Sequence, residues 1–279
     1  MIYLILTILS SAMISIFMRY SERHISAKIP MLSVNYLICM LLTLWQSEGA
    51  ALWLPEAQAG LTLGLGIVNG AVFLLALVLI QYTIYKSGVV LSSVFSKLGS
   101  LVVPLVVAVA CFGEIPTVVQ LAGAALSALA ILLLNGRGTE HKTTGLFSLM
   151  LLFLTQGAAS ALSKVFEQTG GAQLFDHFLF YTFASALLFS IVVCVKRKEW
   201  PGKWELLFGL LIGIPNFFSS RLLLLALNAL PAVIVYPILG VSGIVVVSLA
   251  GVVLFRERLR KQQWIGILVV LLAVLLLNL

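Results

Sequence analysis

The chain has 279 residues, of which 61% are hydrophobic and only 10% are charged, and its net charge at pH 7 is +7. A soluble domain carries about a quarter charged residues, so this composition argues against a soluble fold and indicates a membrane protein with many spans. Basic loops beside membrane helices account for the positive charge, and we therefore do not interpret it as a signal for nucleic-acid binding.

Apolar runs bounded by charged residues, Gly or Pro predict ten membrane-spanning helices, because about 20 apolar residues cross a hydrocarbon layer of about 30 Å. The predicted fold class is an all-α integral membrane protein. The first run has no basic residue before it and no small-residue cleavage site, so it is interpreted as a retained helix. The predicted spans are residues 2–18, 31–45, 60–82, 89–112, 117–134, 145–165, 178–195, 204–227, 232–255 and 263–279.

Two stretches of the sequence, residues 112–135 and 255–278, resemble each other at one fixed offset. The matched pairs are Phe112 with Phe255, Glu114 with Glu257, Gln120 with Gln263, Gly123 with Gly266, Ala130 with Ala273 and Asn135 with Asn278. Self-similarity of this kind is the sequence signature of a repeated structural unit. We therefore predict two copies of a five-helix unit, residues 1–134 and 145–279, joined by a linker at 135–144.

An odd number of helices per copy would invert the second copy in the membrane relative to the first. The basic residues agree with this inversion, since all but three of the 17 Lys and Arg residues lie at loops that follow odd-numbered helices. The exceptions, Lys97, Lys164 and Arg221, lie within apolar spans or at a span's end. The positive-inside rule then predicts that the basic loops are cytoplasmic and that both termini lie outside.

A Phe-x-Glu hinge precedes the last helix of each copy, at Phe112 and Glu114 and again at Phe255 and Glu257, and Pro104 lies ten residues before the first Glu. Ten helices in two such copies resemble the drug/metabolite transporter superfamily, EamA type. The resemblance implies secondary transport of a small metabolite by alternating access, without ATP. We predict that the chain lies in the inner (plasma) membrane. Members usually keep both termini in the cytoplasm, and the basic loops of this chain favour the opposite orientation.

Transporters built from inverted repeats bind substrate near the midplane, where Gly and Pro loosen the helices. The third, fourth, eighth and ninth predicted spans are the candidates for such a site. Their predicted hinge or gating residues are Pro104, Pro215, Pro237, Gly240 and Gly243.

Two basic residues, Lys97 and Arg221, lie inside predicted spans, and no Asp or Glu is predicted at a comparable depth. A charge at the bilayer centre costs roughly 2.5–3.5 kcal/mol and is normally paired or functional. We therefore predict that both bind a carboxylate or phosphate group of the substrate, for which Arg offers bidentate contacts and Lys a point charge. The alternative is that the two side chains snorkel to an interface along their aliphatic stems.

Other polar residues in the spans are weaker candidates for substrate binding. They are Ser93, Ser96 and Ser100 in the fourth span, with Asn69, Asn216, Tyr236, Gln156, Tyr181 and Lys164 elsewhere. Asn69 and Asn216 are equally explained by hydrogen bonds between helices, and Lys164 by a local pair with Glu167. Glu114 and Glu257 lie just before helices on opposite membrane faces, so we interpret them as structural helix caps.

Signatures of enzymes, metal sites and cofactors are missing from the sequence, which has no HExxH, no Ser/His/Asp arrangement and no P-loop. We predict a transporter without enzymatic activity, metal or cofactor, whose partners are a small-molecule substrate and the lipid bilayer. Coupling to protons or to substrate counter-transport, and the choice between monomer and homodimer, stay open. The alternatives are an amino-acid or neutral-metabolite exporter of the same fold, and a non-transporting scaffold or lipid-binding protein.

Overall fold

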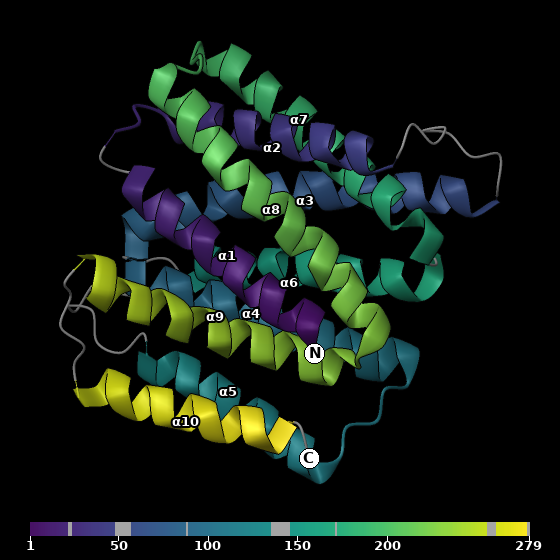
Figure 1. Cartoon of the computed structure of the whole chain (residues 1–279), viewed down its shortest axis with the longest axis vertical. Helices are drawn as coiled ribbons and strands as arrows, with labels where there is room; N and C mark the ends of the chain where they lie inside the picture. Colours follow the sequence, from purple (N-terminus) through teal and green to yellow (C-terminus); the bar gives the residue numbers. More distant parts are fainter. Residues whose placement is uncertain are drawn as a thin grey trace. The chain divides into compact units, whose positions relative to one another are not determined.

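The structure is a computed structural model that describes residues 1–21, 24–47, 57–87, 89–134, 146–170, 172–255 and 261–277. Over these residues the chain forms the helices α1 to α10 and a short 3-10 helix, and no strand (Figure 1). The predicted all-α fold is therefore confirmed for the part of the chain that is described. The predicted linker at 135–144 and Glu257 lie outside the described residues.

The helix bounds follow the predicted apolar runs to within a few residues. In chain order they are α1 (Ile2–Ser21), α2 (Lys28–Gln46), α3 (Ala57–Ser87), α4 (Val89–Phe112), α5 (Val118–Leu134), α6 (Leu146–Gly170), η1 (Ala172–Leu174), α7 (Phe175–Arg197), α8 (Lys203–Ala229), α9 (Ala232–Phe255) and α10 (Lys261–Leu277). The helices α4 and α9 begin and end where the sequence predicted. The helices α2, α3 and α6 are longer than predicted, because they continue past the last apolar residue into polar ends.

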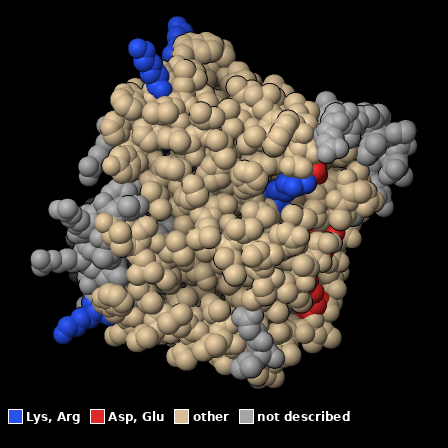
Figure 2. Space-filling model, in the orientation of Figure 1, with Lys and Arg blue, Asp and Glu red and all other residues tan. Residues whose placement is uncertain are grey.

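Each of the ten predicted spans contains an apolar helix. Among the described residues, six segments are long and apolar enough to cross a membrane, and shorter apolar helices occupy the other four spans. Large hydrophobic side chains are exposed along these helices, for example Leu188 at 64% and Leu268 at 61%. On the face that Figure 2 shows, uncharged side chains cover most of the surface. Exposed apolar surface of this kind is the surface that lipid would cover.

The helices group into two compact units. The first unit contains Met1–Leu74 and Val165–Asn228, and the second unit contains Leu75–Lys164 and Ala229–Leu279. Each unit therefore takes helices from both predicted repeats, and α3 and α6 contribute to both units. The repeats are related stretches of sequence whereas the units are groups of packed helices, so this grouping leaves the predicted repeats untested.

In the first unit, helices approach closely where they carry glycine. Helices α2 and α7 lie side by side (Figure 1). A Cβ atom at Gly213 of α8 would lie 2.8 Å from the Cβ atom of Ile38 in α2, closer than real Cβ contacts allow. At Gly70 of α3, a Cβ atom would collide with the Ser185 side chain and the Thr182 carbonyl oxygen of α7. Small residues thus permit backbone approach that van der Waals packing in a membrane requires.

The second unit is built in the same way around α4, α5, α9 and α10. Its buried hydrophobic core joins these four helices through Leu101, Ala130, Val241 and Val270. A Cβ atom at Gly99 of α4 would collide with the α6 backbone. The pair α5 and α10 lies side by side, with α9 in contact with both (Figure 1). This packing brings the polar residues of α4 and α6 together.

The contact of α3 with α7 predicts that Gly70→Ala destabilises the protein. The added methyl group has no space beside Thr182 and Ser185, so we expect the free energy of unfolding to fall by about 1–3 kcal/mol. The measurement is thermal unfolding of the purified protein in detergent.

Gly64→Ala is the matched control for this prediction, because it lies on the same helix and a Cβ atom there meets nothing within 4 Å. That change should be neutral or stabilise the helix by up to about 1 kcal/mol, since Ala has the higher helix propensity. Equal effects of the two substitutions would contradict the described α3–α7 contact.

Candidate functional site

One face of α6 in the second unit carries polar residues at intervals of four, namely Gln156, Ser160 and Lys164, which we call the α6 polar face. The Gln156 side chain donates a hydrogen bond from Nε2 to the Ser96 hydroxyl of α4, at 3.0 Å. The Ser160 carbonyl oxygen accepts a hydrogen bond of 2.6 Å from the Tyr236 hydroxyl of α9. The α6 polar face therefore connects three helices of the second unit through polar contacts.

The third residue of this face, Lys164, forms an ion pair with Glu114. The Lys164 Nζ atom lies 2.7 Å from Glu114 Oε1, and the two side chains are 1% and 18% exposed. The other oxygen, Glu114 Oε2, is buried without a hydrogen-bond partner. The chain turn after α4 brings Glu114 to α6 as a partner that the sequence did not predict for Lys164, and the local pair of Lys164 with Glu167 stays a prediction.

That turn is a glycine C-cap. Gly113 has a φ of +66°, in the left-handed region that glycine tolerates. The Glu114 N–H then donates to the carbonyl oxygen of Ala108, six residues earlier, at 3.1 Å, so the chain folds back on the last turns of α4. This turn ends α4 and directs the chain so that the Glu114 carboxylate reaches Lys164.

The interpretation of Glu114 as a helix cap is wrong. The N-terminus of α5 is capped by a reciprocal pair instead, in which the Gln120 N–H donates to Thr117 Oγ1 at 3.2 Å and the Thr117 N–H donates to Gln120 Oε1 at 3.1 Å. This capping box satisfies the first N–H groups of α5, and Glu114 lies too early in the chain to do so. The matching interpretation of Glu257 falls on a residue outside the described part of the chain.

Lys97 of α4 lies directly after Ser96 and is half-buried. Among the described residues, none forms a hydrogen bond or ion pair with its ammonium group. The Ser100 hydroxyl donates to the Lys97 carbonyl oxygen at 3.0 Å, so this hydroxyl proton is already used within the helix. The side chain of Ser93 lies outside the described part of the chain.

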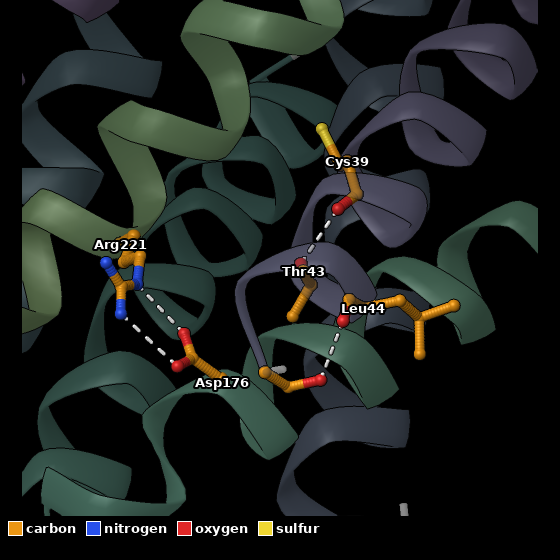
Figure 3. Close-up of polar contacts among 6 residues, drawn as sticks. Cys39, Thr43, Leu44, Asp176 and Arg221 are labelled. Atoms are coloured by element: carbon orange, nitrogen blue, oxygen red, sulfur yellow. Dashed lines mark hydrogen bonds and ion pairs between the residues drawn. The ribbon is translucent and has the colours of Figure 1, made fainter. Parts of the chain in front are cut away.

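Arg221 does have a counter-ion, which corrects the prediction that no acidic residue lies at its depth. Its Nε and Nη2 atoms donate to the two carboxylate oxygens of Asp176 at 2.9 and 3.3 Å (Figure 3). Asp176 lies in the first turn of α7, and the side chains are 29% and 23% exposed. Asp176 precedes the predicted span at 178–195, and no local pattern in the sequence indicates that it contacts Arg221 of α8.

Two asparagines of the first unit form hydrogen bonds between helices. Asn216 of α8 donates to Asn35 Oδ1 of α2 at 3.1 Å, and Asn69 of α3 donates to Thr182 Oγ1 of α7 at 3.5 Å. The alternative of interhelical bonding is confirmed for both, and lining a cavity stays a prediction. The sequence analysis did not single out Asn35, because a polar residue in a short apolar span does not indicate which residue of another helix it will bond. Tyr181, a neighbour of Thr182 on α7, likewise stays a prediction as a substrate ligand.

The predicted hinge residues lie inside continuous helices, and their role stays a prediction. Pro104, Pro215 and Pro237 each interrupt the hydrogen-bond ladder of α4, α8 and α9. On α9, a Cβ atom at Gly240 would touch only Leu101 at 3.9 Å, and one at Gly243 would meet open space. These glycines leave room around α9 in the second unit.

The candidate residues thus fall into two groups. The second unit holds Ser96, Lys97, Ser100, Gln156, Lys164 and Tyr236, and the first unit holds Asn69, Tyr181, Asn216 and Arg221.

Comparison with known proteins identifies the family of one segment of the chain. Residues 143–279 match the model of the EamA-like transporter family. This segment belongs to that family. The resemblance drawn from the Phe-x-Glu hinges is therefore confirmed for this segment. The matched family is one of transporters and not of enzymes, and the apolar helices show that the chain is a multi-pass membrane protein. Within the EamA-like segment lie Gln156, Lys164, Arg221 and Tyr236, whereas Lys97 precedes it.

Two further similarities extend beyond this segment. An uncharacterized protein of Haemophilus influenzae is 24% identical over 212 residues, which cover 74% of this chain and 70% of that protein. A protein of known crystal structure is 14% identical with a TM-score of 0.75, and the alignment covers 99% of this chain and 94% of that one. At this level of identity the second similarity shows a shared fold and nothing about substrate.

The buried ion pair predicts strong coupling between Lys164 and Glu114. Lys164→Met leaves a carboxylate without its counter-ion in a largely closed environment, so we expect the free energy of unfolding to fall by about 3–5 kcal/mol. The double variant Lys164→Met/Glu114→Gln removes both charges and should lose much less than the sum of the two single effects.

The double-mutant cycle compares the wild type, Lys164→Met, Glu114→Gln and the double variant, and thermal unfolding in detergent measures the stability of each. Additive effects of the two single substitutions would show that the two side chains do not interact and would contradict the ion pair.

Proposed function

We propose that this protein is a secondary transporter that moves a small organic metabolite bearing a carboxylate or phosphate group across the inner (plasma) membrane. The observation that carries the proposal is Lys97, a half-buried ammonium group within α4 that has no hydrogen-bond or ion-pair partner among the described residues. A charge inside a membrane span is normally paired or functional. An anionic group of a bound substrate would supply the missing counter-charge.

The residues around Lys97 offer the polar contacts that such a substrate needs. Ser96 and Gln156 already share a hydrogen bond of 3.0 Å, and the Ser96 hydroxyl, which accepts there, keeps its own proton to donate. Tyr236 joins α9 to the same α6 polar face. In this proposal Lys97 attracts the anion, and Ser96 and Gln156 orient it.

Movement by alternating access between inverted repeats is the second part of the proposal. Helices that occupy corresponding places in the two predicted repeats pack against each other, namely α2 with α7 in the first unit and α4 with α9 and α5 with α10 in the second. Such pairing is expected of two copies related by a two-fold axis. Prolines inside α4, α8 and α9 supply the points at which helices bend during the transition.

The orientation of the chain is predicted by its basic loops. Lys196 and Arg197 lie in the last turn of α7, and Lys203 begins α8, so the connection between these helices is strongly basic. The positive-inside rule places this connection in the cytoplasm and both termini outside. A reporter protein fused to the C-terminus should therefore score as non-cytoplasmic, and one inserted between α7 and α8 as cytoplasmic. The reverse pattern would overturn this orientation.

Transport itself is tested by counterflow in proteoliposomes. A thermal-shift screen of acidic, zwitterionic and cationic metabolites first identifies a ligand, because a compound that binds only the folded protein raises its melting temperature. Liposomes loaded with that ligand should then accumulate its radiolabelled form when they contain the wild-type protein. We expect Lys97→Gln to reduce the rate at least about tenfold, which corresponds to roughly 1.4 kcal/mol of lost binding or transition-state stabilisation.

Lys86→Gln is the matched control for the transport assay, because Lys86 is exposed in the last turn of α3. This variant should transport at the wild-type rate. Wild-type rates for Lys97→Gln would contradict the proposed site. A wild-type protein that binds the ligand but shows no counterflow would favour the non-transporting scaffold instead.

A further inference from the structure

The charges of the second unit restrict which anion the proposed site can accept. We infer that the substrate is a monocarboxylate, with one negative charge and no ammonium group. This inference rests on the proposed function, since it assumes that Lys97 contacts the substrate, and it narrows the class of compound that the protein transports.

The other charged groups in the described helix interiors are compensated. Lys164 is neutralised by Glu114 at 2.7 Å, and Arg221 by Asp176 at 2.9 Å. Glu205, near the start of α8, accepts N–H groups from Ser26 at 2.7 Å and Gly202 at 3.1 Å. Lys97 is thus the interior charge without a partner in the described part of the second unit, and the site offers one positive charge.

A phosphate monoester carries about −1.5 to −2 charges at pH 7. Bound at Lys97 it would leave close to one negative charge uncompensated in an environment of low dielectric constant, where an unpaired charge is costly. The nearby hydroxyl of Ser100 could not relieve this cost, because its proton is donated to the Lys97 carbonyl oxygen. A carboxylate has a single charge and two oxygens, which one ammonium and the Ser96 hydroxyl can satisfy.

An amino acid carries an ammonium group that requires an acceptor, best supplied by a carboxylate. Among the described residues of the second unit, Glu114 is the acidic one, and Lys164 already occupies it. The Glu114 N–H is bonded to Ala108, and α4 rises about 16 Å from Lys97 to Ala108. This length is far greater than the separation of the two charges in an α-amino acid, so one amino acid cannot contact both groups.

The inference is tested by a thermal-shift panel on the purified full-length protein. The panel uses short aliphatic and aromatic carbon skeletons, and each skeleton is tested as its carboxylate, α-amino acid, amine and phosphate monoester. The proteins compared are the wild type, Lys97→Gln, Lys97→Arg and the control Lys86→Gln.

We expect a monocarboxylate to raise the melting temperature of the wild type by on the order of 5 °C at a concentration about 100 times its Kd. Lys97→Gln should lose this shift, while Lys97→Arg and Lys86→Gln should keep the preference for the carboxylate. The melting-temperature shifts that the four classes of compound cause in the wild-type protein test the inference even if a variant fails to fold.

The outcomes separate this inference from the proposed function. A larger shift with a phosphate monoester or an amino acid, lost in Lys97→Gln, would overturn the monocarboxylate assignment and leave Lys97 as the binding residue. A shift that survives in Lys97→Gln would overturn both. A panel in which no monocarboxylate raises the melting temperature would also overturn the assignment.

Discussion

The lack of water in a bilayer interior is the constraint on which the rest of this structure depends. Every polar group in a span needs a partner from the protein, because an unsatisfied one costs several kcal/mol in hydrocarbon. The described spans follow this rule closely, with Lys164 on Glu114, Arg221 on Asp176 and Asn216 on Asn35. Lys97 departs from it, and a departure of this kind in a transporter-like fold is where a ligand is expected.

Close helix packing makes these partnerships possible. Without a hydrophobic driving force between helices in lipid, association depends on van der Waals contact, which glycines at the contact points permit. Gly213 brings α8 against α2 beside the Asn216–Asn35 bond, and Gly99 brings α4 against α6 near the Ser96–Gln156 bond. The glycines therefore bring the helices to the short distance at which the polar side chains can form hydrogen bonds with each other.

The glycine turn after α4 shows how one backbone feature affects the charge of a site. Gly113 ends the helix in a left-handed conformation, and Glu114 is thereby directed at Lys164. Because this pair is neutral, Lys97 is the interior charge left without a partner among the described residues of the second unit. The choice of anion in the proposed site thus depends on a glycine that has no contact with the substrate.

The sequence by itself determined the helical class and the ten apolar helices, because hydrophobicity over about 20 residues is a local property. Its Phe-x-Glu hinges also indicated the family that residues 143–279 match. It also identified Lys97 as an interior cation. Tertiary structure alone decided which charges are paired. Arg221 and Asp176 are 45 residues apart, and the sequence left Arg221 without a counter-ion. Glu114 was read as a cap for the same reason, since its partner lies on α6. Contacts between distant helices depend on packing geometry, which no local pattern encodes.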